Sequence, residues 1–326
     1  MIVTRSPLRI SLGGGGTDLP SFYEKHGGFV LSAAIDKFVY VAVNKPFLDQ
    51  YILKYSGIEN CSSIEEIKHP IIRESLRLLI GEKQKVEIST LADIPSGTGL
   101  GSSGSFTVAL LKALSAYSNH PLHADELAAF ACQVEIDILK EPIGKQDQYI
   151  SAYGGIRQFE FSQSGRVNVT NLVVSQKTIN DLDDNLLLFY TGTSRSASAI
   201  LSDQVNKSAT NDASMLENLQ YTKELGFRSK ELLLSGDLHS YGLLMNEHWL
   251  HKKSRSQGMS NSSIDEAYLD ALNNGAVGGK LVGAGGGGFL MFYANDSEKL
   301  RNCMSKWKME EVRFSFDFQG AKVVIS

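Results

Sequence analysis

The stretch at residues 93–105, Asp93-Ile94-Pro95-Ser96-Gly97-Thr98-Gly99-Leu100-Gly101-Ser102-Ser103-Gly104-Ser105, combines three spaced glycines with a pair of serines. The residues before it, 86–90, have the pattern of a strand, and an apolar helical pattern follows from Phe106 to about Tyr117. A helix N-terminus carries unpaired N–H groups and a partial positive charge, and glycines let the backbone come close to an anion. The stretch therefore predicts a phosphate-binding loop; the alternative is a plain glycine-rich turn capped by Ser102.

Two common nucleotide-binding motifs do not describe this loop. The P-loop ends in Gly-Lys-Ser/Thr, but the nearest lysine here is Lys112, inside the predicted helix. The dinucleotide motif Gly-x-Gly-x-x-Gly needs a wider final spacing than residues 97–101 provide. A phosphate held here would depend on backbone N–H groups and serine hydroxyls.

Composition limits the class of protein. The chain has 326 residues, a net charge of −4, 42% hydrophobic residues and 21% charged residues, which is ordinary for a globular enzyme of about two domains. We expect no nucleic-acid partner and no membrane partner, because neither a basic patch nor a long apolar run is present. Cys61, Cys132 and Cys303 lie far apart without metal-ligand spacing, and the N-terminus has no apolar signal core, so we expect buried thiols and a cytoplasmic location.

Strands and helices alternate irregularly along the chain, which favours an α+β fold over a doubly wound sheet. The composition turns polar at residues 176–185, and we place a domain boundary there, between residues 1–180 and 181–326. Strands are expected at residues 2–4, 8–12, 28–35, 38–43, 156–161, 186–190 and 322–325, with a strand–glycine loop–strand unit at 280–293. Helices are expected at residues 71–80, 101–117, 123–139, 196–234, 237–251 and 262–273.

A second glycine-rich segment joins a basic residue to a carboxylate, in Pro7-Leu8-Arg9-Ile10-Ser11-Leu12-Gly13-Gly14-Gly15-Gly16-Thr17-Asp18. Arg9 could stabilise charge on a transferring phosphoryl group, and Asp18 could hold sugar hydroxyls. The alternative is a salt-bridged surface arginine and an aspartate that caps the next helix.

Two further carboxylates suit phosphoryl transfer, which needs a metal ligand and a group that orients the attacking hydroxyl. Glu135 lies late in a predicted helix, and Asp147 follows the loop Pro142-Ile143-Gly144-Lys145-Gln146. A lone helical glutamate is more often a solvated residue. A third glycine run, residues 283–288, precedes an apolar strand and is either a site of close backbone approach or a tight hairpin without a ligand.

Taken together, these segments resemble the GHMP kinase superfamily of galactokinase, homoserine kinase, mevalonate kinase and phosphomevalonate kinase. Its three motifs occur here in order, at residues 6–18, 95–103 and 280–288. The resemblance implies an N-terminal α+β domain like part of a ribosomal protein, followed by a ferredoxin-like C-terminal domain. It also implies ATP and Mg²⁺ as cofactors.

The resemblance carries roles to individual positions. Asp147 would be the base or orienting group, and Arg9 takes the place of the family's basic residue. Glu135 would bind Mg²⁺ together with Ser102 or Ser103. The ATP phosphates would be held by the motif residues Pro95, Gly97, Gly99, Leu100, Gly101, Ser102, Ser103 and Gly104.

The acceptor is predicted from a position where the sequence differs from the galactokinase motif. Where galactokinase has Gly-Glu-His-Thr-Asp, this chain has Gly14-Gly15-Gly16-Thr17-Asp18, which argues against galactose. The four-glycine run resembles the heptose kinase branch, as do Asn246-Glu247-His248-Trp249-Leu250-His251-Lys252-Lys253 and Gly278-Gly279-Lys280-Leu281. That branch phosphorylates the anomeric hydroxyl of D-glycero-D-manno-heptose 7-phosphate, on the way to GDP-heptose for bacterial surface polysaccharide.

A phosphorylated heptose needs spare cations in its pocket. Arg195, Lys252 and Lys253 are the candidates, with hydroxyls from Thr193 and Ser194; the alternative for the lysines is a solvated helix face. Another sugar acceptor, such as L-fucose or an unphosphorylated heptose, and a non-catalytic sugar sensor stay open, as does a homodimer. The predicted acceptor-binding residues are Asp18, Gly15, Gly16, Thr17, Gly144, Thr193, Arg195, Lys253 and Gly286.

Overall fold

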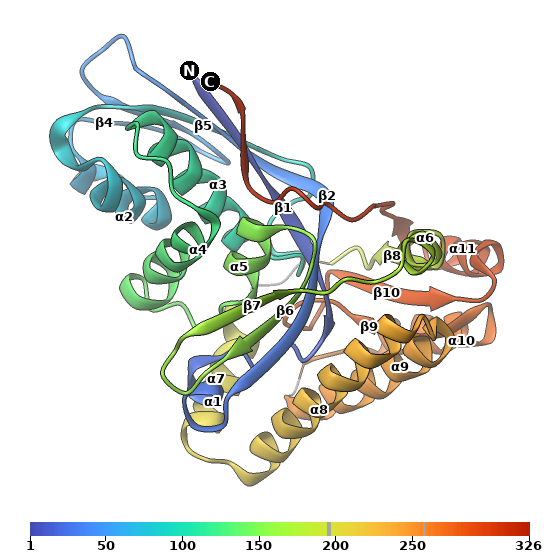
Figure 1. Ribbon diagram of the computed structural model, residues 1–326. Coiled ribbons are helices and arrows are strands. Elements are labelled where there is room, and N and C mark those ends of the chain that lie inside the picture. The colour runs from blue at the N-terminus through green and yellow to red at the C-terminus, as the bar shows by residue number, and fades with distance from the viewer. Residues whose placement is uncertain (194–196, 257) are drawn as a thin grey trace.

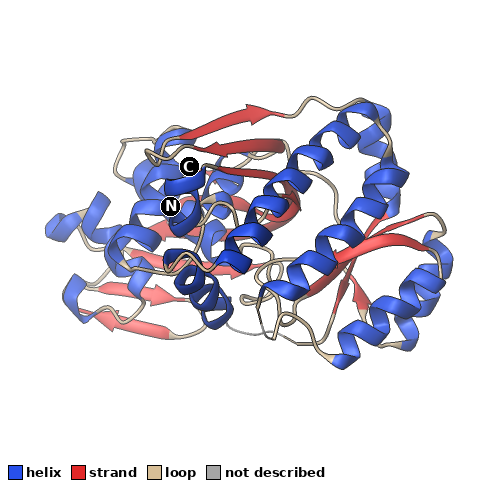
Figure 2. Ribbon diagram, turned by 90° about the horizontal axis from the view of Figure 1, so that it is seen from below, coloured by secondary structure: helices blue, strands red, loops and turns tan. Residues whose placement is uncertain are grey.

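The computed structural model describes residues 1–193, 197–256 and 258–326, and it contains two β-sheets with helices packed on them (Figures 1 and 2). The larger sheet has the order β12-β1-β2-β5-β3-β4, with β6 and β7 branching from β2. The smaller sheet has the order β11-β8-β10-β9. The chain therefore combines helices with mainly antiparallel sheets, as the sequence predicts.

The larger sheet is built mostly from the first half of the chain. Its strands are β1 (Ile2–Gly13), β2 (Gly28–Asn44), β3 (Tyr51–Lys54), β4 (Ile58–Cys61), β5 (Glu87–Ala92), β6 (Ile156–Phe161), β7 (Val167–Asn171) and β12 (Lys322–Ile325). The two short strands expected on either side of Pro7 form the single strand β1, because a register shift between Pro7 and Leu8 accommodates the missing proline N–H.

Five α-helices accompany this sheet, and the central one begins at the 93–105 stretch. They are α1 (Pro20–His26), α2 (Pro70–Leu79), α3 (Ser102–Tyr117), α4 (Ala124–Cys132) and α5 (Gln146–Tyr153), with 3₁₀ turns at Ile64–Glu66 and Gly81–Lys83. Buried Ala109, Leu110 and Leu114 of α3 pack in one core with Val41 and Ile88 of the sheet. The Arg9 N–H donates to the Leu100 carbonyl and the Ser105 hydroxyl to the Ser6 carbonyl, so α3 begins beside the middle of β1.

The helix expected at residues 123–139 changes character partway. Helix α4 ends at Cys132, and a π-helical turn, Gln133–Ile138, follows it. One extra residue per turn rotates the side chains that follow, and Glu135 is completely buried as a result.

The smaller sheet is covered by the long helices of the second half. Its strands are β8 (Leu186–Tyr190), β9 (Ala276–Leu281), β10 (Phe289–Ala294) and β11 (Glu310–Glu311), and the helices are α6 (Gln176–Asn185), α7 (Ala197–Ala209), α8 (Ala213–Ser235), α9 (Leu238–Arg255), α10 (Ser262–Asn273) and α11 (Ser297–Lys306). The long helices α8 and α9 pack side by side (Figure 1). One buried cluster joins the two halves, since Leu12 and Phe29 of the larger sheet pack with Leu188, Tyr241 and Met291.

Further details differ from the expectations, and the two strands expected at residues 28–35 and 38–43 form the single strand β2. The helix expected at 196–234 is two helices, because Asn211 adopts a positive φ of 57° and Asp212 caps α8 by accepting a hydrogen bond from the Met215 N–H. The polar segment expected to separate two domains is helix α6, so a boundary between residues 180 and 181 would fall inside a helix. The final strand, β12, pairs with β1 and returns to the first sheet.

The three cysteines are free and buried, as predicted. Within the described ranges, no helix is long and apolar enough to cross a membrane.

Candidate active site

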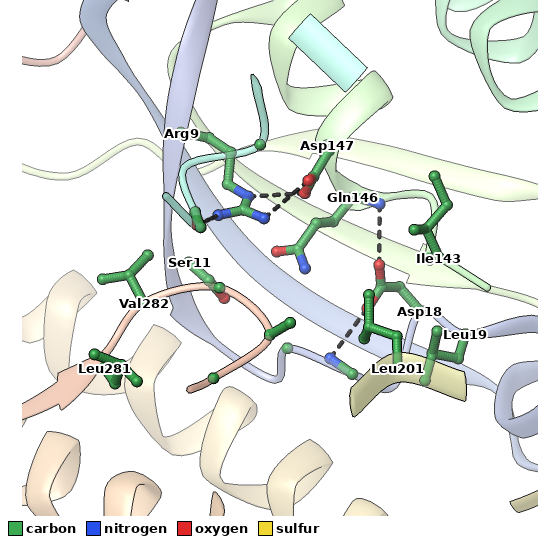
Figure 3. Close-up of a pocket in the computed structure, with 18 of the residues that line it drawn as sticks. Arg9, Ser11, Asp18, Leu19, Ile143, Gln146, Asp147, Leu201, Leu281 and Val282 are labelled. Carbon is green, nitrogen blue, oxygen red and sulfur yellow. Dashed lines mark hydrogen bonds and ion pairs between the residues drawn. The ribbon is translucent and has the colours of Figure 1, made fainter. Parts of the chain in front are cut away.

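An open cavity lies where the three glycine-rich segments meet, between the N-terminus of α3 and the end of α9 (Figure 3). Its wall includes residues from both halves of the chain. Among the predicted site residues, those that line it are Arg9, Gly15, Gly16, Asp18, Gly97, Gly99, Gly101, Ser102, Ser103, Gly104, Gly144, Asp147 and Lys252.

The 97–104 loop has the geometry of an anion cradle. Gly97, Gly99 and Gly101 have φ values of 77°, 86° and 77°, in the left-handed region that favours glycine. Gly101 is the N-cap of α3, and no side chain caps the helix, so the proposed cap Ser102 does not fill that role. The uncapped first turn leaves N–H groups available to an anion.

The third glycine run, residues 283–288, packs against the 97–104 loop. A Cβ on Gly283 would come within 2.5 Å of the Gly99 Cα, and one on Gly288 would lie 2.2 Å from the Thr98 carbonyl oxygen. The run joins β9 and β10, which pair as an antiparallel hairpin. The segment is a hairpin loop, and its backbone approaches the 97–104 loop closely, as the first of the two alternatives predicts.

Arg9 and Asp147 form a two-pronged ion pair in the cavity wall (Figure 3). Nε and Nη2 of Arg9 donate to the two carboxylate oxygens of Asp147 at 2.7 and 2.9 Å, and Nη1 donates to the Gly99 carbonyl at 2.6 Å. The Arg9 side chain is 6% exposed and that of Asp147 is 24% exposed. Arg9 is therefore not a surface residue: it binds the 97–104 loop through Gly99 and leaves the Asp147 carboxylate facing the cavity.

Asp18 lies on the other side of Asp147 from the nucleotide loop. Its carboxylate accepts hydrogen bonds from the Gly16 and Gln146 N–H groups, each at 3.1 Å (Figure 3). A Cβ on Gly144 would come within 1.9 Å of the Asp18 carboxylate, which explains the glycine at that position. The N-cap of α1 is Leu19, so Asp18 is not a helix cap. Burial raises the pKa of Asp18, although the backbone hydrogen bond from Gln146 acts in the opposite direction.

Glu135 is brought to the start of α3 by the π-helical turn. Ser103 and Gln148 donate hydrogen bonds to its two carboxylate oxygens. Burial raises the pKa of Glu135 to about 7, although the hydrogen bonds from Ser103 and Gln148 act in the opposite direction.

These residues fit a magnesium ion bound partly by substrate phosphates. Mg²⁺ usually takes one or two protein carboxylates and completes its shell with water and phosphate oxygens. Glu135 and the Ser103 hydroxyl are in contact, and the neighbouring Gln148 side-chain oxygen is buried with no hydrogen-bond partner among the described residues. A dication beside Glu135 would favour its ionised form.

Several predicted residues do not line this cavity in the described part of the chain. Leu100 is fully buried in the core, and Thr17 uses its hydroxyl on the Gly14 and Phe29 carbonyl oxygens. Lys253 pairs with Asp265 at 3.2 Å. Pro95, Thr193 and Gly286 also lie outside the cavity lining, as does the fully buried Glu135. Ser194 and Arg195 fall outside the described residues.

Two cationic residues of the cavity wall were not among the predicted contacts. The Lys280 Nζ donates to the Leu12 carbonyl at 3.1 Å, and Arg255 reaches the Gly15 carbonyl at 3.3 Å. Helical spacing could have revealed Arg255, because His248, Lys252 and Arg255 lie at i, i+4 and i+7 and all line the cavity. Lys280 carries no such signal, since it lies on a buried strand.

Lys252 is not part of a solvated helix face. Its Nζ donates to the carbonyl oxygens of Leu281 and Gly283. Burial, followed by the charges of Arg255, Lys280 and Arg9, holds the pKa of Lys252 well below its usual range. Burial and the Arg9 charge also lower the pKa of Lys280, to about 7.

Comparisons with known proteins agree with this architecture. Residues 68–155 match the model for the GHMP kinase N-terminal domain, and residues 229–309 match the GHMP kinase C-terminal model. The chain is 30% identical to a D-glycero-alpha-D-manno-heptose 7-phosphate kinase of Campylobacter jejuni, over 98% of both chains.

Two solved structures share the fold. One, described as a putative sugar kinase from Campylobacter jejuni, is 28% identical with a TM-score of 0.77, over 99% of this chain and 97% of that one. The other, a D-glycero-D-manno-heptose 1-phosphate kinase from Bacteroides thetaiotaomicron, is 24% identical with a TM-score of 0.81, over 100% and 99%. With two matching domain models and a relative aligned along nearly its whole length, the chain belongs to the GHMP kinase family and has its two-domain, ATP-dependent kinase fold.

Proposed function

We propose that this kinase transfers the γ-phosphoryl group of ATP to the anomeric hydroxyl of D-glycero-D-manno-heptose 7-phosphate and forms the 1,7-bisphosphate. The observation that carries the proposal is the Arg9–Asp147 pair, set between the nucleotide loop and Asp18. The substrate follows from the four-glycine acceptor loop and from the likeness to a heptose 7-phosphate kinase. In that case the enzyme catalyses a step in the synthesis of GDP-heptose for surface polysaccharide.

The donor site would use backbone rather than lysine. N–H groups at the start of α3, between Gly101 and Gly104, would bind the β- and γ-phosphates with the help of the helix dipole. Glu135 and Ser103 would hold Mg²⁺, which when bound neutralises charge that develops on the transferring group.

Asp147 would receive the acceptor. Its bidentate partner Arg9 fixes the orientation of the carboxylate, so that an oxygen can accept a hydrogen bond from the anomeric hydroxyl. As the O1–phosphorus bond forms and the bond between the γ-phosphorus and the ADP oxygen breaks, the hydroxyl proton passes to an Asp147 carboxylate oxygen. Asp18 would accept hydrogen bonds from other sugar hydroxyls and hold the ring in line.

An ATP-consumption screen over sugars and sugar phosphates tests the proposal. The panel holds heptose 7-phosphate, the same heptose without phosphate, L-fucose, D-galactose and D-mannose 6-phosphate, and ADP release is measured. We expect the highest kcat/KM with heptose 7-phosphate. A higher value with L-fucose or with the unphosphorylated heptose would assign a different acceptor, and no sugar-dependent turnover at all would leave a binding protein.

A further inference from the structure

The cavity wall carries more positive than negative charge. Among the described residues that line it, four are lysine or arginine (Arg9, Lys252, Arg255 and Lys280) and two are carboxylates (Asp18 and Asp147). The Arg9 charge is neutralised by its ion pair with Asp147. Burial lowers the pKa values of Lys252 and Lys280, and Asp18 is the carboxylate whose charge acts on Arg255. Asp18 accepts hydrogen bonds from the Gly16 and Gln146 N–H groups, so the buried Arg255 charge favours an anion that binds here.

Arg255 is the most constrained of these cations. It lies at the end of α9 with 7% of its surface exposed, and its Nε and Nη2 donate to Asn218 at 3.0 Å and to Thr222 at 2.7 Å, both on α8. Its Nη1 donates to the Gly15 carbonyl at 3.3 Å. These partners are all uncharged, and they use one N–H on each guanidinium nitrogen. The described residues take up neither the second N–H on Nη1 nor the second on Nη2, which leaves both to a ligand.

The glycine run at residues 13–16 packs against the Arg255 guanidinium. Gly16 has a φ of 101°, and a Cβ there would lie 2.6 Å from the Arg255 Nη1. A side chain at residue 16 would therefore displace Arg255 from the loop. The glycine run that distinguishes this chain from galactokinase is what admits the cation.

Neighbouring contacts place Arg255 on the acceptor side of the site. A Cβ on Gly101 would touch the Asp147 carboxylate, Gln146 next to Asp147 binds Asp18, and Asp18 binds Gly16, which abuts Arg255. The order along the cavity is thus nucleotide loop, Asp147, Asp18 and Arg255. Lys252, one turn earlier on α9, instead reaches the Gly283 carbonyl beside the nucleotide loop.

We propose that Arg255 is the specificity residue that binds the acceptor's own phosphomonoester through its two remaining N–H groups. The inference rests on the proposed function for the identity of the sugar, and on the Arg255 geometry for the phosphate. An arginine fork suits a phosphate because it offers two parallel charge-assisted hydrogen bonds.

The kinetic test compares Arg255→Met with the wild type on heptose 7-phosphate and on the same heptose without phosphate. We expect KM for the phosphorylated acceptor to rise about 10- to 100-fold, as loss of a charged hydrogen bond implies. KM for ATP and kcat/KM for the unphosphorylated heptose should change less than about threefold, because neither contacts Arg255. Equal losses on the two acceptors would overturn the proposal.

Arg228→Met is the matched control, since Arg228 lies on α8, pairs with Glu247 at 3.0 Å and is 54% exposed. Arg228→Met should leave KM and kcat/KM unchanged for both acceptors. If Arg255→Met does not fold, Arg255→Lys keeps the charge but loses the fork, and it should give a smaller rise confined to the phosphorylated acceptor.

A binding measurement separates this inference from the proposed function. With a non-hydrolysable ATP analogue in place, inorganic phosphate should raise the thermal midpoint of the wild type and of Arg228→Met but not of Arg255→Met. An equal shift in all three proteins would reject the Arg255 site. Failure of the wild type to phosphorylate heptose 7-phosphate would reject the proposed function, and the phosphate shift would then decide the Arg255 site by itself.

Discussion

At the scale of single residues, Asp147 has the most direct role in the proposed chemistry. Its carboxylate is bound by Arg9 and still faces the cavity. Asp147→Asn keeps the shape but removes the proton acceptor and the charge that Arg9 compensates. We expect kcat to fall about 10²- to 10⁴-fold, with the dissociation constant for ATP within about threefold of the wild type.

The measurement is steady-state kinetics together with ATP titration by calorimetry. Asp181→Asn is the control, because Asp181 lies on α6 and pairs with Lys177, remote from the cavity lining. Turnover close to the wild-type value in Asp147→Asn would remove this carboxylate from the reaction.

Lys280 predicts a pH dependence of stability. Its pKa falls from 10.5 to about 7 through burial and the nearby Arg9 charge, and His248 and Lys252 of α9 also face it. Between these two values the unfolded chain binds more protons than the folded one, so the wild-type free energy of unfolding should rise with pH. The charged lysine destabilises the fold most below pH 7, and this penalty is relieved above it.

Lys280→Met removes this titration, while the Leu12 carbonyl still accepts a hydrogen bond from the Tyr241 hydroxyl. In urea unfolding at pH 6, 7, 8 and 9, the free energy of unfolding of the variant relative to the wild type should be highest at low pH. The difference should change by up to about 1.4 kcal/mol per pH unit above pH 7. Parallel pH profiles for the two proteins would mean that Lys280 keeps an ordinary pKa.

At the scale of elements, the packing of two glycine loops determines how the donor site is held. Gly283 leaves no room for a Cβ against Gly99 and has a φ of 79°. Gly283→Ala should push the nucleotide loop outward, raising KM for ATP about tenfold or more while KM for the acceptor changes less.

Gly81→Ala is the control, because Gly81 has a φ of 65° and a Cβ added there would meet no atom within 4 Å. It should cost about 1 kcal/mol of stability from backbone strain and leave KM for ATP unchanged. If Gly283→Ala also affects stability alone, the two loops are independent.

The sequence predicted most elements, and its misses have local physical causes. Glycine spacing and a following apolar period were enough to predict the start of α3. The π-helical turn that holds Glu135 was not predicted, since the apolar period of residues 123–139 continues through it, and the Glu135 contacts with Ser103 and Gln148 are long-range. Helix α6 was missed because its polar composition hides a face that buries Leu182.

At the scale of the whole molecule, the site depends on contacts that no short motif reports. Arg9 and Asp147 are separated by 138 positions, and Arg255 and Gly15 by 240. The family motifs predicted the donor loop, Arg9, Asp18 and Asp147. Lys252 of α9 was named as a candidate cation, but Arg255 of α9 and Lys280 of β9 were not, since they reach the cavity only when the smaller sheet packs against the larger one.

The chain ends tie the molecule together in the same way. Strand β12 lies beside β1, and the two termini are adjacent in Figure 1. The strand β1, which carries Arg9, therefore pairs with a strand from the end of the chain. The larger sheet contains residues from both predicted domains, and the division into residues 1–180 and 181–326 stays a prediction.

Central to the proposed function is the phosphorylation of O1 on a heptose that already carries a phosphate. The most direct measurement is ³¹P and ¹H NMR of the product formed from ATP and D-glycero-D-manno-heptose 7-phosphate. We predict a second phosphomonoester signal coupled to the anomeric proton, with the original 7-phosphate retained. A new phosphate coupled to any other ring proton, or no product while L-fucose is consumed, would contradict the proposed function.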